Sequence, residues 1–105
     1  IAEMFAKLAE TGKLIKVSEL NIGVAETAGG AELAPAALTE EQHHAAADFY
    51  KFVVGKYLET IPAAQQYGIT KWSTSDTAQS ATGLWDANYG RKHTYAGFAA
   101  GLQGE

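Results

Sequence analysis

The chain has 105 residues, of which 47% are hydrophobic and 19% charged, and its formal net charge is -4. This composition is typical of a globular protein and excludes a disordered one, and the length allows one small domain, 1–105, without an internal boundary. The few Lys and Arg residues are scattered and no apolar run is long enough to span a bilayer, so we expect neither a nucleic-acid nor a membrane partner. Because the chain begins at Ile1, we expect a processed, truncated or excised piece.

The first 23 residues predict a helix followed closely by a strand. Residues 1–11 carry apolar side chains at helical spacing (Ala2, Phe5, Leu8 and Ala9), and Gly12 can end this helix in the left-handed conformation. Residues 13–23 (KLIKVSELNIG) are typical of a short buried strand, with Glu19 near its end. A carboxylate among apolar residues is costly unless it is paired, hydrogen-bonded or used, so Glu19 is either a salt-bridged structural residue or a functional one.

A loop over residues 23–38 leads into a long helix. Thr39 and Gln42 have the spacing of a capping box, which predicts a helix over 40–60. Its expected apolar stripe is Ala46, Phe49, Tyr50, Val53, Tyr57 and Ile61. His43 and His44 stand in its first turn, but adjacent helical residues point about 100° apart, so we do not expect the two to ligate one metal.

The last third predicts a second strand and a final helix. Pro62 ends or kinks the long helix, residues 69–73 (ITKWS) read as a strand, and residues 91–102 read as a helix. The expected apolar face of that helix is Tyr95, Phe98, Ala99 and Leu102. Strands that alternate with helices predict a parallel sheet, and two parallel strands do not complete one. Either the piece dimerises or it is the last part of a larger α/β barrel or sheet.

Three stretches together resemble glycoside hydrolase family 10, the endo-β-1,4-xylanases. Residues 17–22 (VSELNI) resemble the strand-seven motif Thr-Glu-Leu-Asp-Ile, whose Glu is the nucleophile. Residues 67–73 (YGITKWS) resemble the strand-eight motif Gly-Ile-Thr-x-Trp-Gly, whose Trp lines the sugar site, and Asp76 falls at the aspartate that follows it. Residues 84–95 (LWDANYGRKHTY) resemble the family ending Leu-Phe-Asp-x-x-Tyr-x-x-Lys-Pro-Ala-Tyr. Their order and spacing agree over essentially the whole chain.

The resemblance implies an α/β fold that is the C-terminal part of a TIM (β/α)8 barrel, about strands seven and eight with flanking helices. It implies a retaining endo-1,4-β-xylanase that hydrolyses xylan, with Glu19 as nucleophile and Trp72 as a sugar platform. Such a mechanism needs a second carboxyl group about 5–5.5 Å away. The family carries that acid/base in an Asn-Glu pair after strand four, so we expect the piece alone to be inactive and to need the remaining N-terminal part of the barrel, in the same or a separate chain. No metal or other cofactor is implied, and the expected localisation is secreted, periplasmic or cell-surface.

The chain also departs from the family pattern. Asn21 replaces the Asp beside the nucleophile, Ser73 replaces a common Gly, and His93 replaces a Pro. The Trp that usually follows the strand-eight aspartate is missing from residues 77–82. These losses suit an alternative, a non-catalytic or degenerate barrel fragment with a carbohydrate-binding or structural role. We further expect Asp86 to cap the turn before the last helix, Tyr89 and Tyr95 to be structural, and Lys92 to hold the terminal loop. From composition alone, a core position for Trp72 is about as well supported as a sugar platform.

Overall fold

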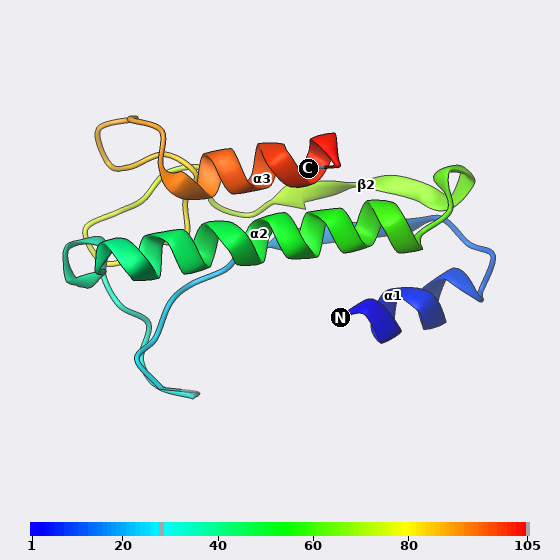
Figure 1. The fold of residues 1–105 in the computed structure, drawn as a ribbon, viewed down its shortest axis with the longest axis horizontal. Coiled ribbons are helices and arrows are strands. Elements are labelled where there is room, and N and C mark those ends of the chain that lie inside the picture. The colour runs from blue at the N-terminus through cyan, green and yellow to red at the C-terminus, as the bar shows by residue number, and fades with distance from the viewer. Residues whose placement is uncertain (28, 105) are drawn as a thin grey trace.

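A computed structural model describes residues 1–27 and 29–104 and contains three α-helices, two strands and two short 3₁₀ turns. The chain runs through α1 (Ala2–Ala9), β1 (Ile15–Leu20), η1 (Pro35–Ala37), α2 (Glu40–Thr60), η2 (Ala63–Gln65), β2 (Gln66–Lys71) and α3 (His93–Gln103). The predicted order of helices and strands is confirmed, and β1 pairs with β2 in parallel. Figure 1 shows α2 lying along the two strands, with α3 beside it.

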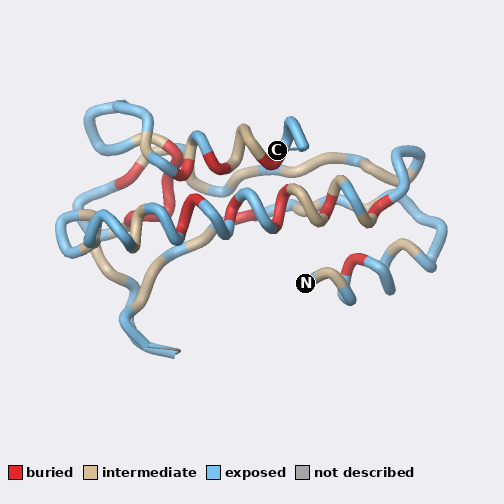
Figure 2. The backbone as a smooth tube through the Cα atoms, viewed as in Figure 1, coloured by how far each residue is buried: buried red, intermediate tan, exposed pale blue. Residues whose placement is uncertain are grey.

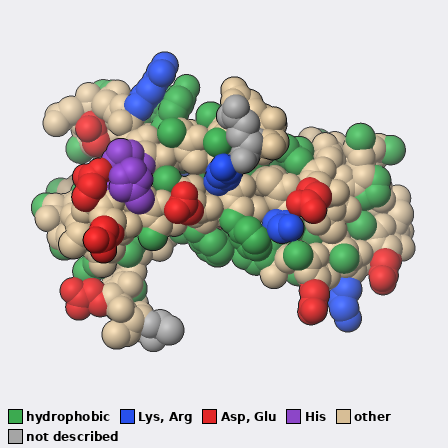
Figure 3. Space-filling model, in the orientation of Figure 1, with side chains coloured by type: hydrophobic (Ala, Val, Ile, Leu, Met, Phe, Trp, Pro, Cys, Tyr) green, Lys and Arg blue, Asp and Glu red, His purple; other side chains and the backbone are tan. Residues whose placement is uncertain are grey.

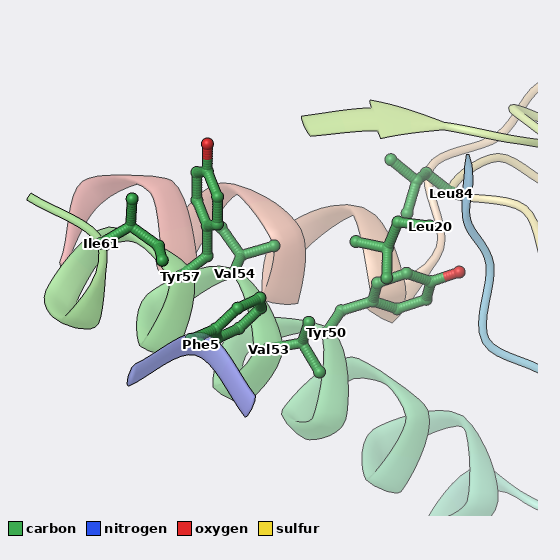
Figure 4. Close-up of a cluster of buried hydrophobic side chains, with 8 residues drawn as sticks. All are labelled: Phe5, Leu20, Tyr50, Val53, Val54, Tyr57, Ile61 and Leu84. Atoms are coloured by element: carbon green, nitrogen blue, oxygen red, sulfur yellow. The ribbon is translucent and has the colours of Figure 1, made fainter. Parts of the chain in front are cut away.

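Helix α2 organises the core. The predicted capping box is present, because Thr39 accepts from the Gln42 amide while the Gln42 side chain accepts from the Thr39 amide. The buried cluster consists of Phe5, Leu20, Tyr50, Val53, Val54, Tyr57, Ile61 and Leu84, and Figure 4 shows it gathered along one face of α2. The predicted stripe is right except at Phe49, which is 44% exposed and stacks on Phe52 outside the core.

Two buried tyrosines of α2 fix both ends of the strand pair. The Tyr57 hydroxyl donates to the Ile15 carbonyl and accepts from the Gly68 amide. The Tyr50 hydroxyl accepts from the Ile22 amide at 3.0 Å and donates to the Thr82 carbonyl at 2.9 Å. A buried hydroxyl is costly without such partners, so each ring both fills the core and determines where the strand ends lie.

The predicted apolar face of α3 is right in part, because Tyr95 and Phe98 pack against the buried cluster, but the closest approach of α3 to α2 is through small residues. The residues that α3 buries are Thr94, Gly97 and Gly101, whereas Leu102 is 52% exposed. A Cβ on Gly97 would come within 2.1 Å of the Ala47 carbonyl oxygen, and one on Gly101 within 2.9 Å of the Lys51 carbonyl oxygen. Glycine is needed at these positions because the two helix backbones approach so closely.

The expectation that β1 is a buried strand is wrong for this chain. Only Leu20 is buried, Ile15 and Val17 are half-buried, and the other strand residues are exposed. Figure 2 shows red, buried segments concentrated on α2 rather than on the strands. The physical reason is that a parallel sheet needs cover on both faces, and the described part of the chain supplies helices on one face of two strands. The second strand also begins at Gln66 rather than Ile69, and Gly68 lies inside it rather than closing a turn.

Candidate functional site

A β-bulge changes the register of β1 next to Glu19. Val17 pairs with Ile69 and Leu20 pairs with Lys71, so three steps along β1 match two along β2. Strict alternation would send Val17 and Leu20 to opposite faces, yet both pack on the hydrophobic core. The extra residue lies between them, where Ser18 and Glu19 are exposed. The bulge therefore includes Glu19 in an exposed stretch next to the end of β1.

Glu19 has no stabilising partner within the described residues. Neither a hydrogen bond nor an ion pair reaches its carboxylate from residues 1–27 or 29–104, and its side chain is exposed. A salt-bridged structural role, the alternative that the spacing alone favours, thus finds no support in this part of the chain.

Trp72 stands at the same end of the strand pair. It follows β2 directly, and its backbone amide donates to the Leu20 carbonyl at 3.0 Å, one residue beyond Glu19. The Trp72 side chain is 67% exposed, so it is not a core residue. The fold brings Glu19 and Trp72 together at the C-terminal ends of two adjacent parallel strands, the edge where α/β barrels carry their active sites.

A polar network joins the two strand ends beneath this edge. The Asn21 side-chain oxygen accepts from the Lys71 ammonium at 2.7 Å and from the Ser73 hydroxyl at 2.9 Å. Lys71 also donates to the carbonyls of Ser73 and Thr82. Asn21 and Ser73 are two of the positions at which the chain departs from the resembled pattern, and here they contact each other. The network holds the end of β1 against the end of β2.

Lys71 is an ionisable group that the sequence analysis did not single out. Its pKa is lowered from 10.5 to about 8, mainly by burial and also by the neighbouring charge of Lys92, while Asp76 opposes the change. Its acceptor on β1 is an amide rather than a carboxylate, so that contact supplies no opposite charge. The signal in the sequence was a Lys inside a predicted strand, directly before Trp72.

We expect protein stability to rise with pH between about 8 and 10 because of Lys71. The pKa of Lys71 is lower in the folded protein than in the unfolded chain, so in this window the unfolded chain binds more protons. Raising the pH therefore disfavours the unfolded chain and increases the free energy of unfolding. Above pH 10 the sign reverses, because burial raises the pKa of Tyr50 from 10.0 to about 12. Urea unfolding across this range should show the rise in the wild-type protein and not in Lys71→Met. Parallel profiles for the two proteins would contradict the assignment.

A buried ion pair fixes the segment between β2 and α3. Lys92 donates to an Asp76 carboxylate oxygen at 2.9 Å, with side-chain exposures of 7% and 2% respectively. The same Asp76 oxygen accepts from the Gly83 amide, and Lys92 also donates to the Ala81 carbonyl. The expectation that Lys92 holds the terminal loop is confirmed by these contacts, which make the pair part of the scaffold rather than of the exposed edge.

The remaining predicted residues of this segment divide into packed and exposed ones. Asp86 caps its turn, because one carboxylate oxygen accepts from the amides of Asn88 and Gly90. Tyr95 packs edge-on against Trp85 with ring centroids 5.1 Å apart. Tyr89, which we expected to be structural, is 78% exposed and has a positive φ of 64°. Its ring does not pack in the core, since a tight turn directs it outward.

The structure also groups three exposed side chains at the start of α2 and α3. A Glu40 carboxylate oxygen lies 2.5 Å from Nε2 of His93 and 3.6 Å from Nε2 of His44. Hydrogen bonding and the charge of His93 hold the pKa of Glu40 below its ordinary value. His43, the neighbour of His44 in sequence, is not part of this group. Sequence reasoning missed the group because its third member comes from another helix.

Comparison with known proteins gives one consistent result. No protein-family model matches the chain. The chain is homologous to the endo-β-1,4-xylanase Xyn10C of Cellvibrio japonicus, with 31% identity over 99% of this chain, and it spans 20% of that relative's length. A solved structure of a mutant of xylanase 10C from that organism, in complex with xylopentaose, superposes with a TM-score of 0.81 at 28% identity, covering 99% of this chain and 24% of the other.

A family 10 xylanase from Gloeophyllum trabeum shares the fold at 21% identity and a TM-score of 0.76, with 96% of this chain and 31% of that one covered. The homologues are thus endo-1,4-β-xylanases of glycoside hydrolase family 10, whose barrels are several times longer than this chain. The resemblance found in the sequence motifs is confirmed.

Proposed function

We propose that this chain is the strand-seven and strand-eight portion of a retaining endo-1,4-β-xylanase. The observation that carries the proposal is the placement of an exposed carboxylate, Glu19, and an exposed indole, Trp72, at one edge of a chain homologous to xylanases. In the proposed role the Glu19 carboxylate attacks the anomeric carbon of a xylose unit. Trp72 offers a flat apolar surface to the sugar ring while polar groups bind its hydroxyls.

The second carboxyl group is proposed to come from the remaining N-terminal part of the barrel. Among the described residues that form this edge, Glu19 is the one acidic side chain on β1 or β2. A retaining mechanism needs a proton donor about 5–5.5 Å from the nucleophile. We place this enzyme in a secreted, periplasmic or cell-surface compartment because xylan is an extracellular polymer, and xylan or a xylo-oligosaccharide is its proposed substrate.

The function is tested by comparing the complete natural polypeptide with the isolated 105-residue chain on xylan. The complete protein should release reducing sugar with retention of anomeric configuration, whereas the isolated chain should release none because it lacks the acid/base. Inversion by the complete protein, or hydrolysis by the isolated chain, would overturn the proposal.

The second candidate is a non-catalytic barrel fragment that binds carbohydrate or supports a scaffold. It is favoured by the missing Trp in residues 77–82 and by Asn21 in place of Asp. The two candidates differ in the rest of the polypeptide, since an Asn-Glu pair after a fourth strand identifies the enzyme. A complete protein that binds xylo-oligosaccharide without cleaving it would establish the alternative.

Replacing Trp72 by Ala should raise KM for xylo-oligosaccharides on the order of 10-fold with a smaller change in kcat, because aromatic contact stabilises the bound sugar in ground and transition state alike. The matched control is Trp85→Phe. Trp85 packs against Tyr95 and aligns with a Phe of the resembled family, so that variant should keep the wild-type KM. Equal KM values for wild type and Trp72→Ala would exclude the platform role.

A further inference from the structure

The search for sites beyond the strand-end edge leads to the group formed by Glu40, His44 and His93. Glu40 and His44 are one turn apart on α2, and His93 is the first residue of α3. Figure 3 shows the histidine side chains gathered at one end of the molecule beside acidic side chains. His93 also stands where the resembled family pattern has Pro, so this group includes one of the positions at which the chain departs from that pattern.

The geometry of the group fits the donor set of a metal site. Each residue offers one ligand atom, and these three atoms lie within 4.8 Å of one another. Two ligands of a tetrahedral zinc ion, each about 2.0–2.1 Å from it, are roughly 3.3 Å apart. The observed separations of 2.5 Å and 3.6 Å from the Glu40 oxygen lie on either side of that value. All three side chains are exposed, so small rotations suffice to bring the atoms to that spacing.

The two imidazoles already face each other. Their ring centroids are 4.1 Å apart with an interplanar angle of 25°. Because the three residues are exposed, water can fill the remaining coordination positions.

We propose that Glu40, His44 and His93 bind a divalent first-row transition metal of the zinc type and thereby link the first turns of α2 and α3. Imidazole with one carboxylate suits Zn²⁺, Cu²⁺ and Ni²⁺, whereas Mg²⁺ and Ca²⁺ prefer oxygen ligands. The site lies outside the strand-end edge, and a bound metal would join the first turns of two helices that also pack through glycines and through Tyr50 and Phe98. The proposal does not depend on the xylanase assignment.

The test titrates Zn²⁺ into the chelator-treated complete polypeptide, followed by calorimetry and by native mass spectrometry. Wild-type protein should bind one more zinc ion than His93→Ala or His44→Ala, and Glu40→Gln should bind it at least about 10-fold more weakly, since even groups that only support a ligand contribute that much. His43→Ala and Glu41→Gln are the matched controls, because each changes the same residue type in the same turn outside the group. Both should retain wild-type binding, and Mg²⁺ should not compete.

Absorption of bound Co²⁺ supplies an independent readout, because its ligand-field bands report coordination directly. These bands should appear in the wild type and in His43→Ala and be absent in His93→Ala. Circular dichroism of each variant should match the wild type, since every substituted ligand is exposed. Equal zinc stoichiometry and affinity in wild type and His93→Ala would overturn the proposal, as would an equal loss in His43→Ala.

Discussion

Replacing Glu19 by Gln in the complete protein is expected to lower kcat on xylan on the order of 10⁴-fold, the scale seen when a covalent nucleophile is removed. In the proposed reaction the Glu19 carboxylate forms a bond to the anomeric carbon as the glycosidic bond breaks, and the departing oxygen takes a proton from the second carboxyl group. Water then attacks the glycosyl-enzyme and regenerates the carboxylate. The amide of Gln is a poor nucleophile, so the first step fails while KM changes little.

Comparing two substrates with different leaving groups distinguishes a nucleophilic role for Glu19 from an acid/base or structural role. An aryl xylobioside with a good leaving group needs little acid assistance but still needs the nucleophile. The Glu19→Gln variant should therefore be as defective on that substrate as on xylan. The matched control is Glu26→Gln, another exposed acid of the same region, which should keep wild-type kcat. Near-normal turnover of the aryl substrate by Glu19→Gln would reassign Glu19 to acid/base catalysis or to structure.

Replacing Lys92 by Met is expected to lower the free energy of unfolding by about 3–5 kcal/mol. The variant leaves the Asp76 carboxylate without its cation in a position where the side chain is only 2% exposed. It also removes the donor to the Ala81 carbonyl, so the segment between β2 and α3 loses two of its attachments. Urea unfolding monitored by tryptophan fluorescence measures the loss directly.

The double variant Asp76→Asn, Lys92→Met distinguishes a lost ion pair from lost packing. It removes the unpaired charge and keeps a side-chain oxygen for the Gly83 amide, so it should be more stable than Lys92→Met alone. The control Lys56→Met breaks a pair with Glu59 that is largely exposed, and it should change stability by about 1 kcal/mol or less. If Lys92→Met and Lys56→Met lower the free energy of unfolding equally, the buried Asp76–Lys92 pair contributes no more to stability than an exposed pair.

Local signals made α2 and the element order predictable. Thr39 and Gln42 define the start of α2, Pro62 defines its end, and the apolar spacing between them identifies the buried face. The candidate site could also be located from the sequence. Glu19 lies near the end of the first strand and Trp72 directly follows the second, and parallel strands bring their C-terminal ends to the same edge. The first strand was expected to be buried, but three of its six residues are exposed and only Leu20 is buried, since burial depends on neighbours that the described residues do not include.

Other features could not be read from local patterns because they arise between elements. The face of α3 was predicted only in part: Tyr95 and Phe98 pack against the core, but Gly97 and Gly101, which lack apolar side chains, are the residues that let the helix backbones touch. The hydrogen bonds that Lys71 and Ser73 donate to Asn21 likewise join residues about 50 positions apart.

The sequence by itself determined the alternation of helices and strands, the long capped helix and the family resemblance, because hydrophobic periodicity, capping residues and motif spacing are local properties of the chain. Only the tertiary structure decided that a bulge lies next to Glu19, that Lys92 pairs with Asp76, and that His93 meets Glu40 and His44. These outcomes depend on which side chains meet in space, and that is set by the register of the strands and the close packing of the helices.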